Sequence, residues 1–238
     1  HYRNVFQLMN LWFGNSKIKM PQNNILLQFS NADRIYEYYC LLGLYDVLLD
    51  LGYEEIFEKR ETNKYKVNYV KFENTEQENT FYFKKDNIQV TLYYQPVIYT
   101  DQATTTNAIE LFRTDRSFYT PDFIIKKTVN NKSTYGILDA KWRNRDTLLD
   151  KRKEGGMQDL VYKYLYSVVD AGTMQNVEFL WLLQGKDDNK GIKMWMQRNG
   201  MKSRQQKEKF RLASGIVRYT PKSGNEEIKK VMYTFLSN

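Results

Sequence analysis

Cysteine and histidine are almost absent from this 238-residue sequence, and their scarcity excludes several classes of protein. A single cysteine, Cys40, cannot form an internal disulfide, and so low a count is typical of a reducing compartment. One cysteine and one histidine cannot build a structural zinc site or a metal centre based on histidines. No apolar run approaches the length of a membrane span and no segment resembles a signal peptide, so we expect a cytoplasmic protein without membrane contact.

Acidic residues are outnumbered by basic ones. The sequence contains 36 Lys+Arg against 28 Asp+Glu, a net charge of +8 and a pI of about 9.2. Such an imbalance attracts polyanions, nucleic acid first. No repeat or low-complexity linker divides the chain, so we expect one domain over residues 30–238, preceded by a helical extension over residues 1–29. Because the sequence begins with His1, we expect that extension to continue an upstream region.

Helical and alternating patterns of apolar residues both occur, which predicts a mixed α/β (α+β) fold. The spacing predicts helices over residues 2–13, 34–51, 157–171 and 225–236. Alternating or continuous apolar segments predict strands over residues 65–72, 80–84, 88–94, 177–184, 192–197 and 216–219. Asp86 and Asn87 can form a tight turn, so the strands on either side are expected to pair as an antiparallel β-ribbon.

Two further strand-like segments, 119–126 and 135–142, carry the most informative polar residues. The turn-forming residues 129–133 between them predict a β-hairpin. Side chains alternate along a strand, so Asp139 and Lys141 point to one side and Ala140 to the other. If the hairpin brings Asp122 near Asp139, two carboxylates and an ammonium group converge, and carboxylate oxygens are the ligands that Mg²⁺ prefers.

Glu37 is a second candidate, because it begins an apolar stripe of the helix predicted over residues 34–51. The stripe continues through Leu41, Leu44 and Leu48. In one interpretation Glu37 is a solvated first-turn acid favoured by the helix dipole. In the other it is a partly buried acid directed at the metal site, and the residues alone leave both open.

Other polar residues follow the hairpin. Gln158 and Tyr162 are one helical turn apart, so an amide and a phenol can project together. Two basic clusters, one directly after the hairpin and one within residues 198–211, are expected to contact nucleic acid, with solvated surface charge as the alternative. The candidates are Arg143, Arg145, Lys151, Arg152, Lys202, Arg204 and Lys207.

Together, Pro121-Asp122 and Asp139-Ala140-Lys141 resemble the signature of PD-(D/E)XK nucleases, in which acids hold the metal and the lysine positions or activates water. The helix around Glu37 and the later Gln158-x-x-x-Tyr162 resemble McrC-like and RecB-like members, although Thr120 stands where many McrC-like sequences carry arginine. The resemblance covers residues 30–185. It implies a restriction-endonuclease-like core, a central mixed β-sheet flanked by helices, with an extra N-terminal helical segment and the β-ribbon.

The same resemblance implies a metal-dependent DNA endonuclease of a restriction or anti-phage defence system. It implies Mg²⁺, for which Mn²⁺ can substitute, bound by Asp122, Asp139 and the backbone carbonyl of Ala140, with Glu37 as an outer or second-metal ligand. Gln158 and Tyr162 would support the site and contact the nucleic-acid backbone. An AAA+ NTPase or another defence-system subunit is the implied partner.

Two other functions stay open at this point. The chain could be a catalytically inactive, basic nucleic-acid-binding module, or an interaction domain of a larger assembly. The complete set of two acids and a lysine favours the enzyme over both. The oligomeric state stays undetermined, with a homo-oligomer among the options.

Overall fold

The computed structural model describes residues 32–60, 66–67, 70–71, 79–99, 110–114, 119–175, 177–186, 191–198, 211–221, 223 and 225–237, and the structural statements below concern these residues. Its helical elements are α3 (Ala32–Asp50), the 3₁₀ turn η1 (Phe57–Lys59), α4 (Arg145–Leu149), α5 (Met157–Leu160), the π-helical η3 (Val161–Tyr166) and α6 (Glu226–Leu236). The predicted helix 2–13 and the extension 1–29 lie outside the described residues.

One eight-stranded mixed sheet forms the centre of the fold, in the order β1-β4-β5-β7-β8-β10-β12-β11. Strand β10 pairs in parallel with β8 and β12, and the other neighbours are antiparallel. The strands are β1 (Glu54–Glu55), β4 (Thr80–Lys85), β5 (Ile88–Tyr94), β7 (Phe123–Val129), β8 (Lys132–Lys141), β10 (Phe179–Gln184), β11 (Ile192–Arg198) and β12 (Arg211–Arg218). Two-stranded sheets are formed by β2 (Lys66–Val67) with β3 (Val70–Lys71), and by β6 (Leu111–Arg113) with β9 (Val168–Asp170).

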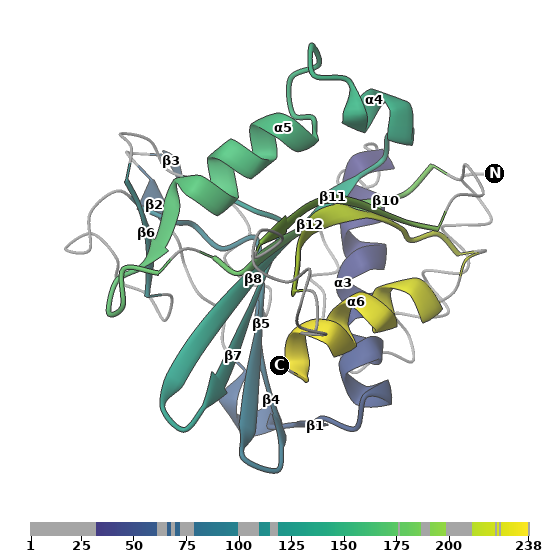
Figure 1. Ribbon diagram of the computed structural model, residues 1–238. Helices are drawn as coiled ribbons and strands as arrows, with labels where there is room; N and C mark the ends of the chain where they lie inside the picture. The colour runs from purple at the N-terminus through teal and green to yellow at the C-terminus, as the bar shows by residue number, and fades with distance from the viewer. Residues whose placement is uncertain are drawn as a thin grey trace, which may run out of the picture.

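Helices cover both faces of this sheet, as the mixed α/β fold requires. In Figure 1, α4 and α5 lie on one side of strands β10 and β12 and α6 lies on the other. The buried side chains form two main cores that follow the same division. One core contains α3 and α6 with side chains such as Leu138 and Trp181, and the other contains α5 and η3 with side chains such as Ile137 and Leu182. Successive residues of β8 therefore enter different cores, as strand geometry demands.

The hairpins follow the sequence closely. Strands β7 and β8 pair from Phe123 with Leu138 to Val129 with Lys132, joined by Asn130 and Asn131, which both have positive φ. Two such residues are typical of a type I′ hairpin turn, and asparagine tolerates this conformation well. The predicted β-ribbon exists as β4 and β5, and because β5 also pairs with β7 the ribbon is part of the central sheet.

The helix predicted over residues 157–171 is shorter than expected. It changes to π-helical hydrogen bonding at Val161 and ends at Tyr166, and Val168–Asp170 then forms strand β9 against β6. Two consecutive valines favour a strand once a partner is present, and β6 supplies that partner from 57 residues earlier in the chain. The periodicity of the helix alone did not reveal this tertiary pairing.

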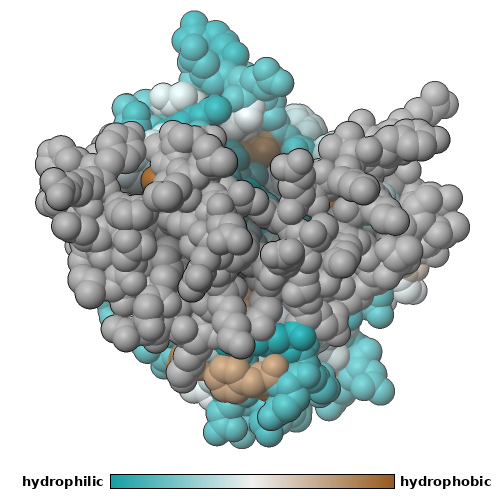
Figure 2. Space-filling model, turned by 180° about the vertical axis from the view of Figure 1, so that it is seen from behind, coloured by the Kyte–Doolittle hydropathy of each residue, from teal (hydrophilic) through white to brown (hydrophobic). Residues whose placement is uncertain are grey.

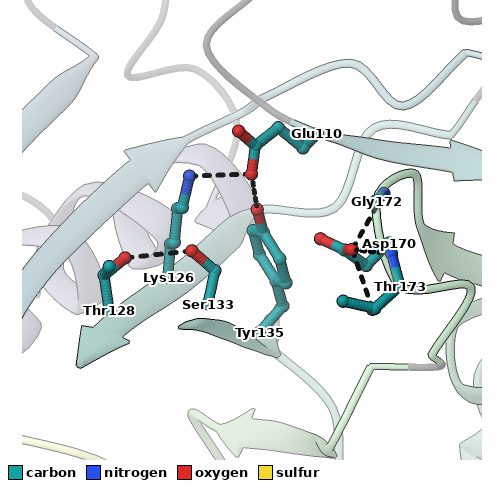
Figure 3. A network of polar contacts seen from close by, with 8 residues as sticks. All are labelled: Glu110, Lys126, Thr128, Ser133, Tyr135, Asp170, Gly172 and Thr173. Atoms are coloured by element: carbon teal, nitrogen blue, oxygen red, sulfur yellow. Dashed lines mark hydrogen bonds and ion pairs between the residues drawn. The ribbon is translucent and has the colours of Figure 1, made fainter. Parts of the chain in front are cut away.

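Polar contacts anchor the β7–β8 hairpin to the chain before β6 (Figure 3). Glu110 accepts hydrogen bonds from Lys126 Nζ at 3.1 Å and from the Tyr135 hydroxyl at 2.9 Å. Asp170, at the end of β9, accepts bonds from the backbone of Gly172 and Thr173 at 3.0 and 2.7 Å and so closes the following turn. Glu110 thus holds the middle of the β7–β8 hairpin, whose edges pair with β5 and β10.

The described part of the surface is largely hydrophilic. Figure 2 shows hydrophilic residues at both the upper and lower edges of the molecule, with a small hydrophobic spot at the lower edge. The loop between α4 and α5, which projects upward in Figure 1, carries exposed Lys151, Arg152 and Lys153. Among the described residues, no helix is both long enough and apolar enough to cross a membrane.

Close approach explains a glycine in the middle of β12. Gly215 pairs with Trp181 of β10, and a Cβ atom there would lie 2.5 Å from the Trp181 ring and 2.6 Å from the backbone oxygen of Lys193. We expect Gly215→Ala to lower the free energy of unfolding by about 1–3 kcal/mol, the usual cost of overpacking. Denaturant unfolding checks this. Gly172→Ala is the control, since its Cβ would meet only Asp170 Oδ1 at 3.5 Å, and equal stability of both variants would contradict the explanation.

Candidate active site

Asp122 is held at the point where β7 and β8 separate. It directly precedes β7, whose first residue, Phe123, makes the last pair with β8 at Leu138. Strand β8 continues for three more residues, and the Ala140 N–H donates to Asp122 Oδ2 at 2.7 Å. The Asp122 carboxylate therefore accepts the hydrogen bond that a partner strand would otherwise accept. This bond connects the Pro-Asp motif to the Asp-x-Lys motif.

Strand geometry also places the carbonyl group of Ala140. The N–H and C=O of one residue point to the same edge of a strand, and successive residues alternate between edges. Lys141 O accepts from the Gly185 N–H at 3.0 Å on the β10 side, whereas Ala140 N–H bonds on the Asp122 side. The Ala140 carbonyl thus faces the same side as Asp122.

Asp139 and Lys141 point to the same face of β8, as the alternation predicted. Their neighbour Ala140 belongs to the core under α3 and α6, while Ile137, two residues before Asp139, belongs to the core under α5 and η3. Lys141 Nζ and Asp139 Oδ1 form a short ion pair. Asp139 is only 3% exposed, so Lys141 neutralises a carboxylate that water barely reaches.

The Asp139 carboxylate perturbs Asp122. Burial and the adjacent Asp139 carboxylate raise the pKa of Asp122 well above its usual value, although Lys141 opposes this shift. Burial alone would lower the pKa of Lys141, but the Asp139 and Asp122 carboxylates raise it above its ordinary value. Lys141 therefore carries its proton at neutral pH and serves as a fixed positive charge.

Glu37 reaches the same end of the sheet from α3. Its Oε2 accepts from Gln95 Nε2 at 2.8 Å and from Arg34 Nη1 at 3.0 Å, and the Gln95 N–H in turn donates to the Asp122 carbonyl at 2.7 Å. Burial raises the pKa of Glu37, while the charges of Arg34 and Lys141 oppose this. Glu37 is thus a partly buried acid directed at the site, and the interpretation as a fully solvated first-turn residue is wrong.

The helix after the hairpin presents different residues to the site than its spacing suggested. Gln158 has a buried side-chain oxygen, but Tyr162 is 60% exposed and its ring lies 5.7 Å from that of Tyr166. The amide and the phenol therefore do not project together. Tyr164 is buried instead, and its burial together with the Asp139 and Asp122 carboxylates raises its pKa well above the ordinary value.

The predicted nucleic-acid contacts divide into three groups. Arg143, Lys151 and Arg152 are exposed, as a phosphate contact requires. Arg145 is 5% exposed and donates to Gln184 Oε1 at 3.2 Å and to the Gly191 carbonyl at 2.6 Å, so its prediction as a nucleic-acid contact is wrong. Its guanidinium connects α4 to the strand ends in the interior. Three others, Lys202, Arg204 and Lys207, lie outside the described residues.

A family comparison agrees with this geometry. A model of the PD-(D/E)XK nuclease superfamily matches residues 34–178, which is more than half of the chain. This chain belongs to the PD-(D/E)XK nuclease superfamily. Searches of curated proteins and of solved structures found no match. The matched span contains Glu37, Asp122, Asp139, Lys141 and Gln158, and membership implies nuclease activity.

PD-(D/E)XK nucleases typically use divalent metal ions, and the donor atoms here fit one. Within the described ranges, no three acidic, histidine or cysteine side chains form a group that could hold a metal by themselves. Two adjacent carboxylates, Asp122 and Asp139, repel each other, which a cation between them would relieve. The Ala140 carbonyl on the Asp122 side supplies a third oxygen, and an all-oxygen set suits a hard cation.

Two residues near this candidate site gave no signal in the sequence. Gln95 follows β5 in a polar segment with no motif, and its backbone has a positive φ of 49°. Lys163 lies next to Tyr162, and its ammonium lies 4.6 Å from the ring centroid of Tyr119. No local pattern indicated either residue, because both become site residues only through packing between distant segments.

Exposed Arg143 and buried Arg145 allow the same substitution to be compared at the surface and in the interior. We expect Arg145→Met to lower the free energy of unfolding by about 2 kcal/mol, because Gln184 Oε1 and the Gly191 carbonyl lose a charged donor. Arg143→Met should stay within about 0.5 kcal/mol of wild type, as surface substitutions usually do. Urea unfolding of the two variants checks this, and similar losses in both would contradict the interior position of Arg145.

The raised pKa of Asp122 predicts a gain in stability when its charge is removed. Its folded-state pKa lies above the unfolded value of about 3.9, so ionisation costs stability as pH rises above that value. Without divalent metal, Asp122→Asn should therefore melt at a higher temperature than wild type at pH 7, and the difference should shrink toward pH 4. Thermal scans across this range check it, with Asp146→Asn, an exposed acid on α4, as control. A lower melting temperature for Asp122→Asn at pH 7 would contradict the repulsion.

Proposed function

We propose that this protein is a metal-dependent endonuclease that hydrolyses phosphodiester bonds in DNA, with Mg²⁺ as the metal and Mn²⁺ able to replace it. The observation that carries the proposal is the convergence of Asp122, Asp139 and Lys141 where β7 and β8 separate. Two acids and a protonated lysine are the groups needed to hold a cation and to act on a phosphate. Membership in the nuclease superfamily supports the same reaction class.

In this proposal Asp122, Asp139 and the Ala140 carbonyl would hold the metal. A bound divalent cation would supply the positive charge that polarises the scissile phosphate and acidifies a water molecule. Lys141, kept protonated by its carboxylate neighbours, orients the attacking water or stabilises the charge that develops on the phosphate. Glu37 acts as an outer ligand, because its carboxylate is already bonded to Gln95 and Arg34.

The surroundings of the site support binding of the DNA backbone. Arg143 lies two residues after the end of β8, and Lys151 and Arg152 are exposed on the projecting loop between α4 and α5. We extend the proposed contact surface to Lys202, Arg204 and Lys207 on the strength of their charge in the sequence. Gln158 supports the site from inside α5, and Tyr162 is available for contact with the backbone because it is exposed.

We further propose that the protein belongs to the McrC-like or RecB-like group and acts in a restriction or anti-phage system beside an AAA+ NTPase. The order of motifs along the chain supports this finer assignment: an acid on a helix, Pro-Asp, Asp-x-Lys, and then Gln-x-x-x-Tyr. A partner motor would supply unwinding or translocation, for which the described residues contain no candidate site.

The reaction is tested with supercoiled plasmid in the presence of Mg²⁺, Mn²⁺ or a chelator, with a matched RNA substrate in parallel. We expect cleavage of DNA by wild type with either metal. Asp139→Asn removes a metal ligand and Lys141→Met removes the charge that acts on the phosphate, so each should lower the rate by about 100-fold or more. Neither should weaken DNA binding strongly, because each changes only one contact.

Two exposed residues provide controls of the same chemical type. Asp146→Asn and Lys132→Met should cleave at the wild-type rate, since both side chains are exposed and neither contacts the acids. Wild-type cleavage by Lys141→Met would contradict the hydrolase proposal. Absence of metal-dependent cleavage by wild type, even with its natural partner added, would favour a basic binding module. Preferential cleavage of RNA would identify RNA, not DNA, as the substrate.

A further inference from the structure

Lys163 is a second lysine near the segment that carries Asp122, in addition to Lys141 of β8. It belongs to the π-helical η3, which covers the face of the sheet to which Asp139 points. Its ammonium lies 4.6 Å from the ring centroid of Tyr119 and 4.9 Å from that of Tyr164. Tyr119 is three residues before Asp122, so the ring that holds Lys163 belongs to the same segment as the acid. π-helical turns inside α-helices often occur at functional sites.

The contact with Tyr119 places this ammonium beside the segment that leads into Asp122. Burial lowers the pKa of Lys163, the Asp139 and Asp122 carboxylates oppose this shift, and Lys141 adds to it. Lys163 is therefore within electrostatic reach of both acids and of the other lysine. The guanidinium of Arg113 also lies over the Tyr119 ring and brings a further positive charge to the same segment.

Lys163 differs from Lys141 in the groups that surround its ammonium. Lys141 is paired with Asp139, whereas within the described part of the chain no hydrogen bond or ion pair occupies the Lys163 ammonium. Aromatic faces attract a cation without neutralising it and leave its three donors able to bind an anion. A half-buried ammonium of this kind costs stability unless a ligand compensates for it.

We propose that Lys163 binds a non-bridging phosphate oxygen of the DNA backbone at the acids, so that the phosphate lies between the ammonium groups of Lys163 and Lys141. The inference rests on the proposed nuclease function and names a further substrate contact of the same site. Tyr119 and Tyr164 position the ammonium, and their apolar faces reduce its hydration. The contact offsets the repulsion that a phosphate meets from Asp122 and Asp139.

The test measures binding separately from cleavage. Fluorescence anisotropy with a labelled DNA duplex, without divalent metal and with a chelator, gives the association constant over a range of salt concentrations for wild type, Lys163→Met and Lys163→Arg. Loss of one phosphate contact should reduce the magnitude of the log–log salt slope by about 0.9 in Lys163→Met, which corresponds to about fivefold weaker binding at 0.15 M salt. Lys163→Arg keeps the charge and should keep most of the slope.

Lys132→Met is the control for simple loss of one positive charge. Lys132 is exposed at the opposite end of β8, about 24 Å along the strand from Asp139 at 3.4 Å per residue, so its slope should equal that of wild type. Melting temperatures establish that each variant is folded. A slope for Lys163→Met equal to wild type would overturn the inference, and a lower melting temperature with an unchanged slope would assign Lys163 a structural role instead.

The cleavage and binding measurements together distinguish failure of this inference from failure of the proposed nuclease function. A wild-type protein that binds the duplex but cuts no DNA with any divalent metal would overturn the nuclease proposal, while the slope difference would still support the phosphate contact. A wild-type protein that cuts DNA, with equal salt slopes for wild type and Lys163→Met, would overturn only the role of Lys163. Absence of any salt-dependent binding to DNA would overturn both.

Discussion

The hydrogen bond from the Ala140 N–H to Asp122 Oδ2 is the contact on which the site depends. It forms because β8 extends past the last pair with β7, which leaves a backbone donor that a carboxylate can satisfy. A buried donor without a partner would cost free energy, so the strand geometry selects this position for Asp122. The bond also determines the side on which Asp139, Lys141 and the Ala140 carbonyl lie relative to Asp122.

The convergence of Asp122, Asp139 and Lys141 places three charged groups where water solvates them only in part, which costs free energy. Asp122 and Asp139 repel each other, and the single charge of Lys141, which pairs with Asp139, offsets the repulsion at Asp122 only in part. The rest of the fold makes such a site tolerable, because β8 is paired on both sides and covered by separate cores on its two faces. Strain of this kind commonly marks functional sites, where a bound ligand or metal completes the balance of charge.

Much of the fold and part of the site could be predicted because the relevant signals are local. The alternation along β8 predicted the common direction of Asp139 and Lys141, and the Asn130-Asn131 turn predicted the hairpin. The apolar stripe of α3 made Glu37 a candidate and left two interpretations open, and the hydrogen bond from Gln95 decided between them. Where the predictions were wrong, distant segments decided the outcome: β6 turned the end of a predicted helix into β9, and Gln184 with Gly191 drew Arg145 into the interior.

The sequence by itself determined the mixed α/β class and the pairing of the hairpins, because side-chain alternation and turn residues are local signals. Its resemblance to PD-(D/E)XK nucleases indicated the superfamily and singled out two acids and a lysine as candidate site residues. Only the tertiary structure decided which further groups join them. Gln95, Lys163 and Tyr119 come from segments separated by tens of residues, and no local periodicity relates them. Their positions depend on how a loop, a π-helical turn and the isolated β-bridge between Ile98 and Tyr119 pack against the end of one strand, which is a property of the folded chain.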